Sequence, residues 1–152
     1  MIRGFEIVRD DCRKFPNLDI KLPTRNDKGS AGYDFYSPID FTINPGETKI
    51  VPMDIKAYML QDEVLCLWIR SSMGIKKRIV LSNQTGVVDS SYYSNPDNDG
   101  NICTALTNMS NNTYEVKAGD KIMQGVFMKY LVADNDQPLN EERIGGIGST
   151  GR

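Results

Sequence analysis

The feature that most constrains the fold of this 152-residue chain is a series of short apolar segments separated by turn signals. Residues 39–43 and 55–59 alternate apolar and polar side chains, as half-buried strands do. Residues 64–69 are a short continuous apolar run, as expected of a central strand buried on both faces. Further strand candidates are residues 18–22, 79–81, 102–107, 114–117 and 121–130. Their spacing of roughly ten residues predicts an all-β sandwich or barrel.

The sequence predicts little helix and a single domain over residues 1–152. A helical turn or two is expected after Ser71 and Ser72, where a hydroxyl side chain can cap residues 73–77. No internal repeat, low-complexity tract or linker interrupts the chain. Four glycines fall within the last eight residues, so a mobile glycine-rich C-terminal arm is expected over about residues 143–152.

Residue types that are missing or evenly spread exclude several classes of function. With no histidine in the chain, Ser-His and Cys-His catalytic pairs and all His-ligated metal sites are excluded. The 18 basic and 20 acidic residues give a formal net charge of −2, and neither sign forms a long block. Because a basic stripe is absent, the sequence predicts no polymeric nucleic acid as a partner.

The cysteines and the N-terminal residues indicate a cytoplasmic protein. Cys12, Cys66 and Cys103 are isolated and form no C-x-x-C pair, which is typical of reduced thiols. Residues 1–6 lack an apolar signal segment. The longest apolar run, residues 64–69, is far too short to cross a membrane, so no membrane association is expected.

One segment, residues 83–93, combines a carboxylate, an amide and aromatic side chains within a short stretch. Asp89 ends a short apolar run and is followed by two hydroxyl residues and two aromatic residues, while Asn83 and Gly86 precede the run. Glycine lets the backbone turn sharply and approach another molecule closely. Such a segment can position a water molecule, read the edge of a ring and pack against a sugar. The simpler interpretation is a β-hairpin that carries polar side chains on its surface.

Four other segments also differ from ordinary loops. Residues 30–34 place a carboxylate after a small-residue turn, and residues 70–74 offer a guanidinium, two hydroxyls and the amides of a helix start, which favour an anion. Residues 118–124 form a turn that feeds a strand. In residues 143–151, glycines, two hydroxyls and an arginine make a loop whose amides can surround a phosphate. The simpler interpretations of these four segments are, in the same order, a strand-entry turn, a capped surface turn, a turn at the start of a strand and a disordered tail.

Taken together and in this order, the five segments resemble the motifs of homotrimeric dUTPases (deoxyuridine triphosphate nucleotidohydrolases). Residues 31–34, 70–72, 83–92, 119–124 and 145–151 resemble motifs one to five. The similarity is closest to the enzymes of low-GC Gram-positive bacteria and their phages. It implies a distorted jelly-roll barrel or sandwich and a homotrimer. Each active site then takes motif three from one chain, motifs one, two and four from a second, and motif five from the third, so a monomer is inactive.

The resemblance implies a dUTP diphosphatase that converts dUTP to dUMP and pyrophosphate, which keeps uracil out of DNA and supplies dUMP for dTMP synthesis. Water attacks the α-phosphorus, and Asp89 acts as the catalytic general base, a role that typically contributes about 10² to 10⁴ in rate. The implied cofactor is Mg²⁺, held mainly by the phosphates and water. Asp34 acts on the metal through water, because Mg²⁺ keeps its water ligands.

The resemblance also implies a set of substrate-binding residues. Asn83 and the backbone from Gly86 to Val88 read uracil, and the Tyr92 ring packs beneath the deoxyribose and excludes a 2′-hydroxyl. The remaining members contact the phosphates or close over the nucleotide. The full set is Arg70, Ser71, Ser72, Asn83, Gly86, Val88, Tyr92, Gln124, Arg143, Ile147, Gly148, Ser149 and Thr150.

This chain departs from the family pattern in several places. Ile147 stands where a phenylalanine usually covers the uracil, and Ser91 stands where a second aspartate is common. Arg143 is one residue nearer the paired glycines than in many members. One hypothesis is that Tyr93 replaces the missing aromatic stacking. The acidic loop of residues 94–100 is longer than usual and has no role beyond a surface loop.

Two alternative functions are a dCTP deaminase and a regulatory protein that binds a repressor. A dCTP deaminase shares the fold but needs a catalytic glutamate in the strand after motif three, and Ala105 stands at that position. A regulatory protein of this fold, as in some phages, binds a host repressor and uses the nucleotide as a switch. The intact Asp89 favours an active enzyme, although activity and binding of a repressor are compatible.

Overall fold

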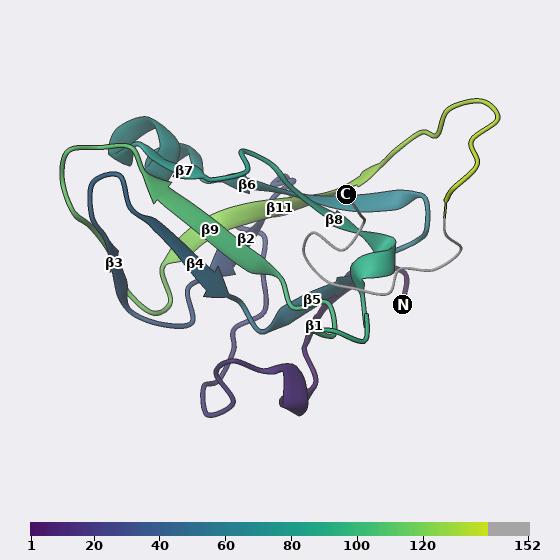
Figure 1. Ribbon diagram of the computed structural model, residues 1–152, viewed down its shortest axis with the longest axis horizontal. Helices are drawn as coiled ribbons and strands as arrows, with labels where there is room; N and C mark the ends of the chain where they lie inside the picture. Colours follow the sequence, from purple (N-terminus) through teal and green to yellow (C-terminus); the bar gives the residue numbers. More distant parts are fainter. Residues whose placement is uncertain (140–152) are drawn as a thin grey trace.

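The chain folds into antiparallel β-strands joined mostly by short turns, with two longer connections over residues 8–32 and 90–102 (Figure 1). The structure is a computed structural model, and it describes residues 1–139. The strands are β1 (Gly4–Ile7), β2 (Tyr33–Tyr36), β3 (Phe41–Ile43), β4 (Thr48–Pro52), β5 (Ile55–Tyr58), β6 (Glu63–Ile69), β7 (Ile79–Leu81), β8 (Gly86–Asp89), β9 (Cys103–Asn108), β10 (Tyr114–Val116) and β11 (Lys121–Lys129). Three helical turns complete the described part: η1 (Asp10–Cys12), η2 (Ser72–Lys76) and η3 (Ser90–Tyr92).

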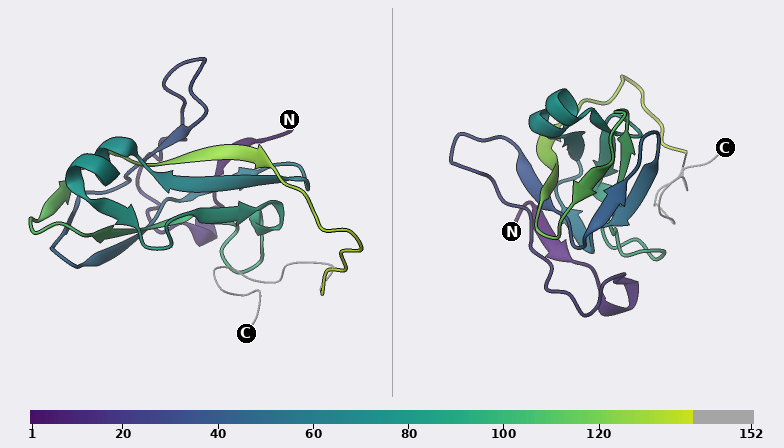
Figure 2. Two further views of the ribbon diagram at one scale, coloured as in Figure 1. Left: turned by 90° about the horizontal axis from the view of Figure 1, so that it is seen from above. Right: turned by 90° about the vertical axis from the view of Figure 1, so that its left-hand side faces the viewer.

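Two larger sheets form the layers of a sandwich (Figure 2). One has the strand order β2-β11-β6-β8, and the other has the order β4-β9-β7. Strand pairs β1-β5 and β10-β3 extend the layers. Apolar side chains from both sheets are buried in one core, namely Phe35, Leu65, Leu67 and Met123 from the first sheet and Ile79, Leu81 and Leu106 from the second. The predicted all-β class is therefore confirmed.

Most predicted strands lie close to the observed ones, with one error. The apolar run at residues 64–69 is β6, an inner strand of its sheet, as predicted. Residues 18–22 form no strand, although their side chains alternate. Only Ile20 of this segment is buried, whereas Leu18 and Leu22 are exposed. A local alternation is not sufficient, because a strand also needs a neighbour to accept its backbone hydrogen bonds.

The helical turn expected after Ser71 is present, but it begins without the predicted cap. η2 is a single turn of π-helix, and the Ser71 side chain makes no capping hydrogen bond. The N–H groups of Met73 and Gly74 both donate to the carbonyl oxygen of Arg70, at 3.0 Å each. The wide turn therefore uses a backbone acceptor and leaves the serine hydroxyls out of its capping. Within residues 1–139, no helix has the length and apolar character needed to span a membrane.

Candidate active site

Three of the five motif segments meet at one pocket of about 720 Å³. Its walls contain Asn26, Ser30, Ala31, Gly32, Asp34, Trp68, Arg70, Ser71, Ser72, Gln124 and Val126. Strand pairing explains why these distant segments meet. On β11, Gln124 lies opposite Asp34 of β2 on one side and opposite Trp68 of β6 on the other. Arg70, Ser71 and Ser72 follow the end of β6 directly. The sheet thus brings motifs one, two and four together.

The Asp34 carboxylate is buried between two cations. Its oxygens lie 3.0 Å from Arg70 Nε and 2.8 Å from Lys121 Nζ. A buried carboxylate requires such partners, because desolvation otherwise disfavours its charge. About one third of the Arg70 side chain is exposed (33%), and Arg70 lines the pocket. Its guanidinium can therefore also face an anion there.

Lys121 is a residue that sequence reasoning missed. Strand pairing shifts register between Lys121 and Met123, so that Ile122 is inserted as a β-bulge. Lys121 pairs with Tyr36, and Gln124 pairs with Asp34. Because the bulge shifts the alternation of side chains by one residue, Lys121 and Gln124 lie on the same face of the sheet. The only signal in the sequence is a lysine within a motif segment, and nothing local indicates the bulge.

Gln124 is held close to the backbone by its surroundings. Its Nε2 donates to the carbonyl oxygen of Ile69 at 3.3 Å. A Cβ atom added to Gly32 would lie 2.6 Å from Gln124 Oε1, which is closer than real Cβ contacts allow. The glycine of the first motif segment therefore provides the space in which the Gln124 amide lies.

Ser71 and Ser72 complete the polar part of the pocket. Both side chains are exposed and line the pocket beside Arg70. A guanidinium, two hydroxyls and an amide form a donor-rich set, which suits the oxygens of a phosphate. Asp34 is the carboxylate of this pocket. Within residues 1–139, no cluster of three aspartate, glutamate or cysteine side chains could hold a metal ion.

Motif three lies away from this pocket in the same chain. Asp89 is exposed at the end of β8 and pairs with Val64, near the start of β6. Arg70 follows the other end of β6. Six residues of strand at roughly 3.3 Å each separate the two positions by about 20 Å. The Asp89 carboxylate is thus too distant to act on a phosphate held by Arg70 of its own chain.

Of the other motif-three residues, Asn83 is exposed, whereas Gly86 and Val88 are buried. Asn83 is exposed in the turn before β8. Gly86 is buried against Leu67, where an added Cβ would lie 3.1 Å from the leucine side chain. The Val88 side chain points into the core and is 7% exposed. Only backbone groups of Gly86 and Val88 are therefore candidates for contact with a ligand.

Tyr92 and Tyr93 both make specific hydrogen bonds. Tyr92, in η3, is buried, and its hydroxyl donates to the carbonyl oxygen of Asn101 at 2.9 Å. The Tyr93 hydroxyl donates to Glu6 Oε2 at 2.7 Å. Lys56 Nζ lies 4.8 Å from the centre of the Tyr93 ring, and Tyr58 packs edge-on against that ring. This packing gives Tyr93 contacts with β1 and β5 of its own chain, and its stacking on the base stays a hypothesis.

The residues expected to close over the nucleotide are not covered by the structure. Arg143, Ile147, Gly148, Ser149 and Thr150 lie outside the described residues 1–139, as does the predicted C-terminal arm. Their roles stay predictions.

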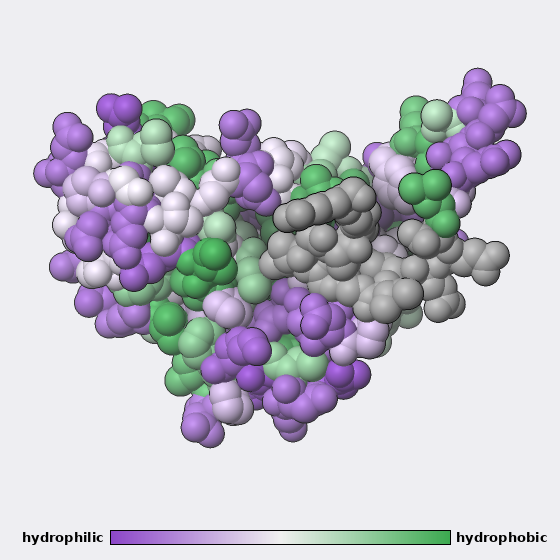
Figure 3. Space-filling view, viewed as in Figure 1, coloured by the Kyte–Doolittle hydropathy of each residue, from purple (hydrophilic) through white to green (hydrophobic). Residues whose placement is uncertain are grey.

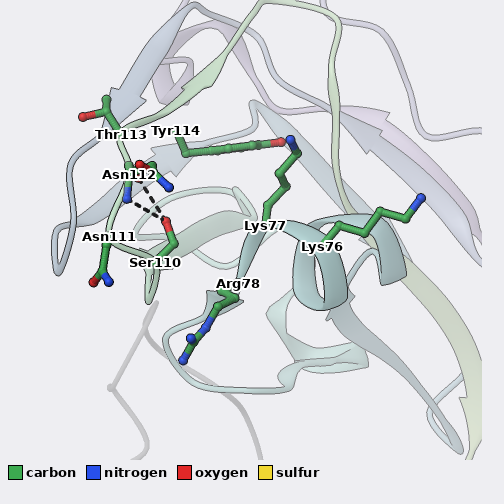
Figure 4. A pocket seen from close by; sticks show the side chains of 8 residues that line it. All are labelled: Lys76, Lys77, Arg78, Ser110, Asn111, Asn112, Thr113 and Tyr114. Carbon is green, nitrogen blue, oxygen red and sulfur yellow. Dashed lines mark hydrogen bonds between the residues drawn. The ribbon is translucent and has the colours of Figure 1, made fainter.

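A second hollow, of about 430 Å³, lies at the end of η2 (Figure 4). Lys76, Lys77 and Arg78 line one side, and residues 110–114 line the other. The Ser110 hydroxyl lies 2.7 Å from Asn108 Oδ1 and 3.0 Å from the carbonyl oxygen of Asn112, within its own turn. The hollow therefore offers positive charge, but the Ser110 hydroxyl is already used within the turn.

Comparison with known proteins identifies a family. The family model described as dUTPase matches residues 19–151. A deoxyuridine 5'-triphosphate nucleotidohydrolase of Lactococcus lactis subsp. lactis is 44% identical over 151 residues, which are 99% of this chain and 98% of that protein. The protein of the same description from Haemophilus influenzae (strain ATCC 51907 / DSM 11121 / KW20 / Rd) is 33% identical over 88% of this chain and 89% of its own length.

Solved structures agree with this result. The dUTPase of Streptococcus mutans is 42% identical, has a TM-score of 0.74, and is matched over 86% of this chain and 98% of its own. A D95N mutant of the dUTPase from phage phi11 of S. aureus is 21% identical with a TM-score of 0.69, over 94% of this chain and 100% of its own. That structure is described as coordinating a structural Mg(II) ion, and at this identity the likeness shows the fold alone. The chain belongs to the dUTPase family.

Proposed function

We propose that this protein hydrolyses dUTP to dUMP and pyrophosphate by attack of water on the α-phosphorus. The observation that carries the proposal is the convergence of Arg70, Ser71, Ser72 and Gln124 beside Asp34 in one pocket, in a chain of the dUTPase family. The reaction removes dUTP, keeps uracil out of DNA and supplies dUMP for dTMP synthesis. The free thiols of Cys12, Cys66 and Cys103 suit action in the reducing cytoplasm.

The phosphates are assigned to the donor-rich side of the pocket. Arg70, Ser71 and Ser72 offer charge-assisted and neutral hydrogen bonds to phosphate oxygens. Donors fixed in advance stabilise the charge that develops on the departing pyrophosphate. Gln124 lines the same pocket and donates from its amide to the Ile69 carbonyl oxygen. Arg143, Ser149 and Thr150 are proposed to close over the γ-phosphate, with Ile147 and Gly148 over the base.

Asp89 is proposed as the general base that orients and deprotonates the attacking water. Its exposure at the end of β8 leaves the carboxylate accessible to a substrate bound on another chain. Because about 20 Å of strand separates it from Arg70, we propose a homotrimer with shared sites. Motif three comes from one chain, motifs one, two and four from a second, and motif five from the third.

The residues of the pocket fit a Mg²⁺ ion that is held through water and phosphate oxygens. Among residues 1–139, Asp34 is the one carboxylate that lines the pocket, and Mg²⁺ usually binds through one or two carboxylates together with water and phosphates. Asp34 would hold a metal-bound water, in competition with Arg70 and Lys121. When bound, the ion supplies positive charge that neutralises the triphosphate.

Selection of the base and sugar is assigned to motif three. The exposed Asn83 side chain and backbone groups from Gly86 to Val88 are proposed to read uracil. Cytosine reverses the donor and acceptor at position 4, so fixed groups would be left unpaired against it. Tyr92 is proposed to lie beneath the deoxyribose through the 6% of its surface that stays exposed, and so to exclude a 2′-hydroxyl.

The test compares the wild-type protein with Asp89→Asn on each deoxynucleoside triphosphate in the presence of Mg²⁺. We expect preference for dUTP, and a fall in kcat of at least about 100-fold in the mutant because the general base is lost. Unchanged thermal unfolding of Asp89→Asn is the control for folding. Preference for another nucleotide, or near-normal turnover in the mutant, would contradict the proposal.

No observation favours the two alternatives. Ala105 lies in β9, where a deaminase would need a glutamate. The phage dUTPases described as controlling the transfer of virulence genes are 19–20% identical to this chain, a level that shows the fold alone. A regulatory role and a repressor partner are therefore not proposed.

A further inference from the structure

The loop after motif three, residues 94–100, holds the hydroxyl end of Tyr92. Asn98 Nδ2 donates to the Tyr92 hydroxyl at 2.7 Å, and that hydroxyl donates to the carbonyl oxygen of Asn101 at 2.9 Å. The hydroxyl therefore has both a donor and an acceptor in fixed positions. Two such bonds at the end of a rigid side chain restrict the tilt of its ring.

The orientation of the Asn98 amide is itself fixed by the loop. Asn98 Oδ1 accepts from Asn95 Nδ2 at 2.8 Å and from the Gly100 N–H at 3.0 Å. With its oxygen directed at two donors, the amide presents its nitrogen to Tyr92. Asn95 Nδ2 also donates to the carbonyl oxygen of Tyr92, at 2.8 Å. Side chain and backbone of Tyr92 are thus both bonded to the loop.

The loop is anchored in turn to the body of the protein. Asp99 is buried, and one of its oxygens accepts from Lys56 Nζ at 2.8 Å and from the Arg9 N–H at 2.7 Å. Gly100 adopts a left-handed conformation with φ +82°, and an added Cβ would lie 2.7 Å from the Tyr92 carbonyl oxygen. The loop therefore lies at a fixed position relative to β5 and to Tyr92.

We propose that Asn98 is a positioning residue for sugar selection, since it sets the tilt of the Tyr92 ring and so the space available at the 2′-carbon of the nucleotide. This inference rests on the proposed function and assigns a role to a loop that lies outside the five motifs. Asn98 acts through Tyr92 and need not touch the substrate. Its loss should change selection between deoxyribose and ribose more than it changes the chemical step.

The test measures kcat and KM for dUTP and for UTP, which differ only in the 2′-hydroxyl. The informative variant is Asn98→Asp, which keeps the size and the acceptor Oδ1 but replaces the amide donor to Tyr92 by an oxygen. Loss of one hydrogen bond typically changes an equilibrium constant by about fivefold. We expect the ratio of kcat/KM for dUTP to that for UTP to fall about fivefold, mainly through KM, with kcat for dUTP within about twofold of wild type.

Two further variants complete the design. Asn17→Asp is the matched control, because Asn17 is exposed and lies outside the pocket and motif three. Tyr92→Phe removes the same hydrogen bond from the other side, together with the bond from the hydroxyl to the Asn101 carbonyl oxygen. If Asn98 acts through the Tyr92 hydroxyl, Asn98→Asp should add no further loss of selectivity in the Tyr92→Phe background. Should Asn98→Asp fail to fold, Tyr92→Phe carries the same expected fall in the ratio.

The outcomes separate the two proposals. If the wild-type protein is active but the folded variants keep the wild-type ratio of kcat/KM for dUTP to that for UTP, the inference alone is overturned. Equal falls of kcat/KM for both substrates would also overturn it. Additive effects in the double variant would also overturn it. A wild-type protein that does not hydrolyse dUTP would overturn the proposed function and this inference with it.

Discussion

At the scale of single residues, a buried ion pair fixes the segment that follows motif three. Lys56 and Asp99 have side-chain exposures of 9% and 1%, and their charged atoms lie 2.8 Å apart. Burial alone would raise the pKa of the Asp99 carboxyl, but hydrogen bonds from Lys56 and the Arg9 backbone outweigh burial and hold that pKa below its usual value. The ionised pair therefore contributes to the stability of the folded chain.

This lowered pKa predicts how stability depends on pH. An Asp99 carboxyl with a depressed pKa in the folded state stabilises the protein above its unfolded pKa of about 4, and this contribution is lost as pH falls through the folded value. We expect Asp99→Asn to be less stable than wild type at pH 7, and the gap in unfolding free energy to narrow below about pH 4. Urea unfolding between neutral and acid pH measures the gap. A constant gap over this range would contradict the assignment.

At the scale of elements, β11 organises its sheet because it packs closely against its neighbours. It lies between β2 and β6, and all its pairings are antiparallel. At Gly125, an added Cβ would lie 2.9 Å from Leu65, 3.0 Å from Phe35 and 3.1 Å from Leu67. Such distances leave no room for a side chain. Close packing at Gly125 and the bulge near Lys121 together set the position of Gln124 in the pocket.

Gly125→Ala should therefore destabilise the sheet. Overpacking of a filled core typically costs about 1–3 kcal/mol, because neighbours must leave their preferred rotamers. Chemical denaturation of wild type and variant measures the difference. Gly29→Ala is the control, since a Cβ there would lie 3.4 Å from Asp27 Oδ1, an ordinary contact. Equal stability of Gly125→Ala and wild type would contradict the described packing.

At the scale of the whole molecule, one chain separates two groups that the proposed mechanism brings together. Asp89 and Arg70 lie near opposite ends of β6. The surface also exposes apolar side chains, including Ile50 at 69%, Val87 at 63% and Leu131 at 97%. Figure 3 shows apolar areas between polar ones on one face. Exposed apolar surface favours association, which agrees with the proposed trimer.

Mixing two inactive variants tests the shared site. Arg70→Ala and Asp89→Asn should each lose activity alone. If they are unfolded and refolded together, some sites combine an intact Asp89 from one chain with an intact Arg70 from another. With random assembly, about a quarter of the sites regain both groups. Each variant refolded alone is the control, and no recovery in the mixture would place both residues in one chain's site.

Local sequence patterns were sufficient to predict the all-β class, most strand positions and the residue types of the candidate site. Alternation of side chains and turn residues are local properties, so they can be read without knowledge of the fold. The motif segments around Asp34, Arg70 and Gln124 were likewise visible as local patterns. Their order along the chain was sufficient to indicate the family that the comparisons then showed.

Which of these residues meet depends on the folded arrangement of the strands. Strand pairing joins residues far apart in sequence, and a shift of one residue moves a side chain to the other face. No local pattern therefore predicts the bulge that brings Lys121 to Asp34. The absence of a strand at residues 18–22 likewise has no local signal. The same holds for the contacts of Tyr93 with β1 and β5 of its own chain.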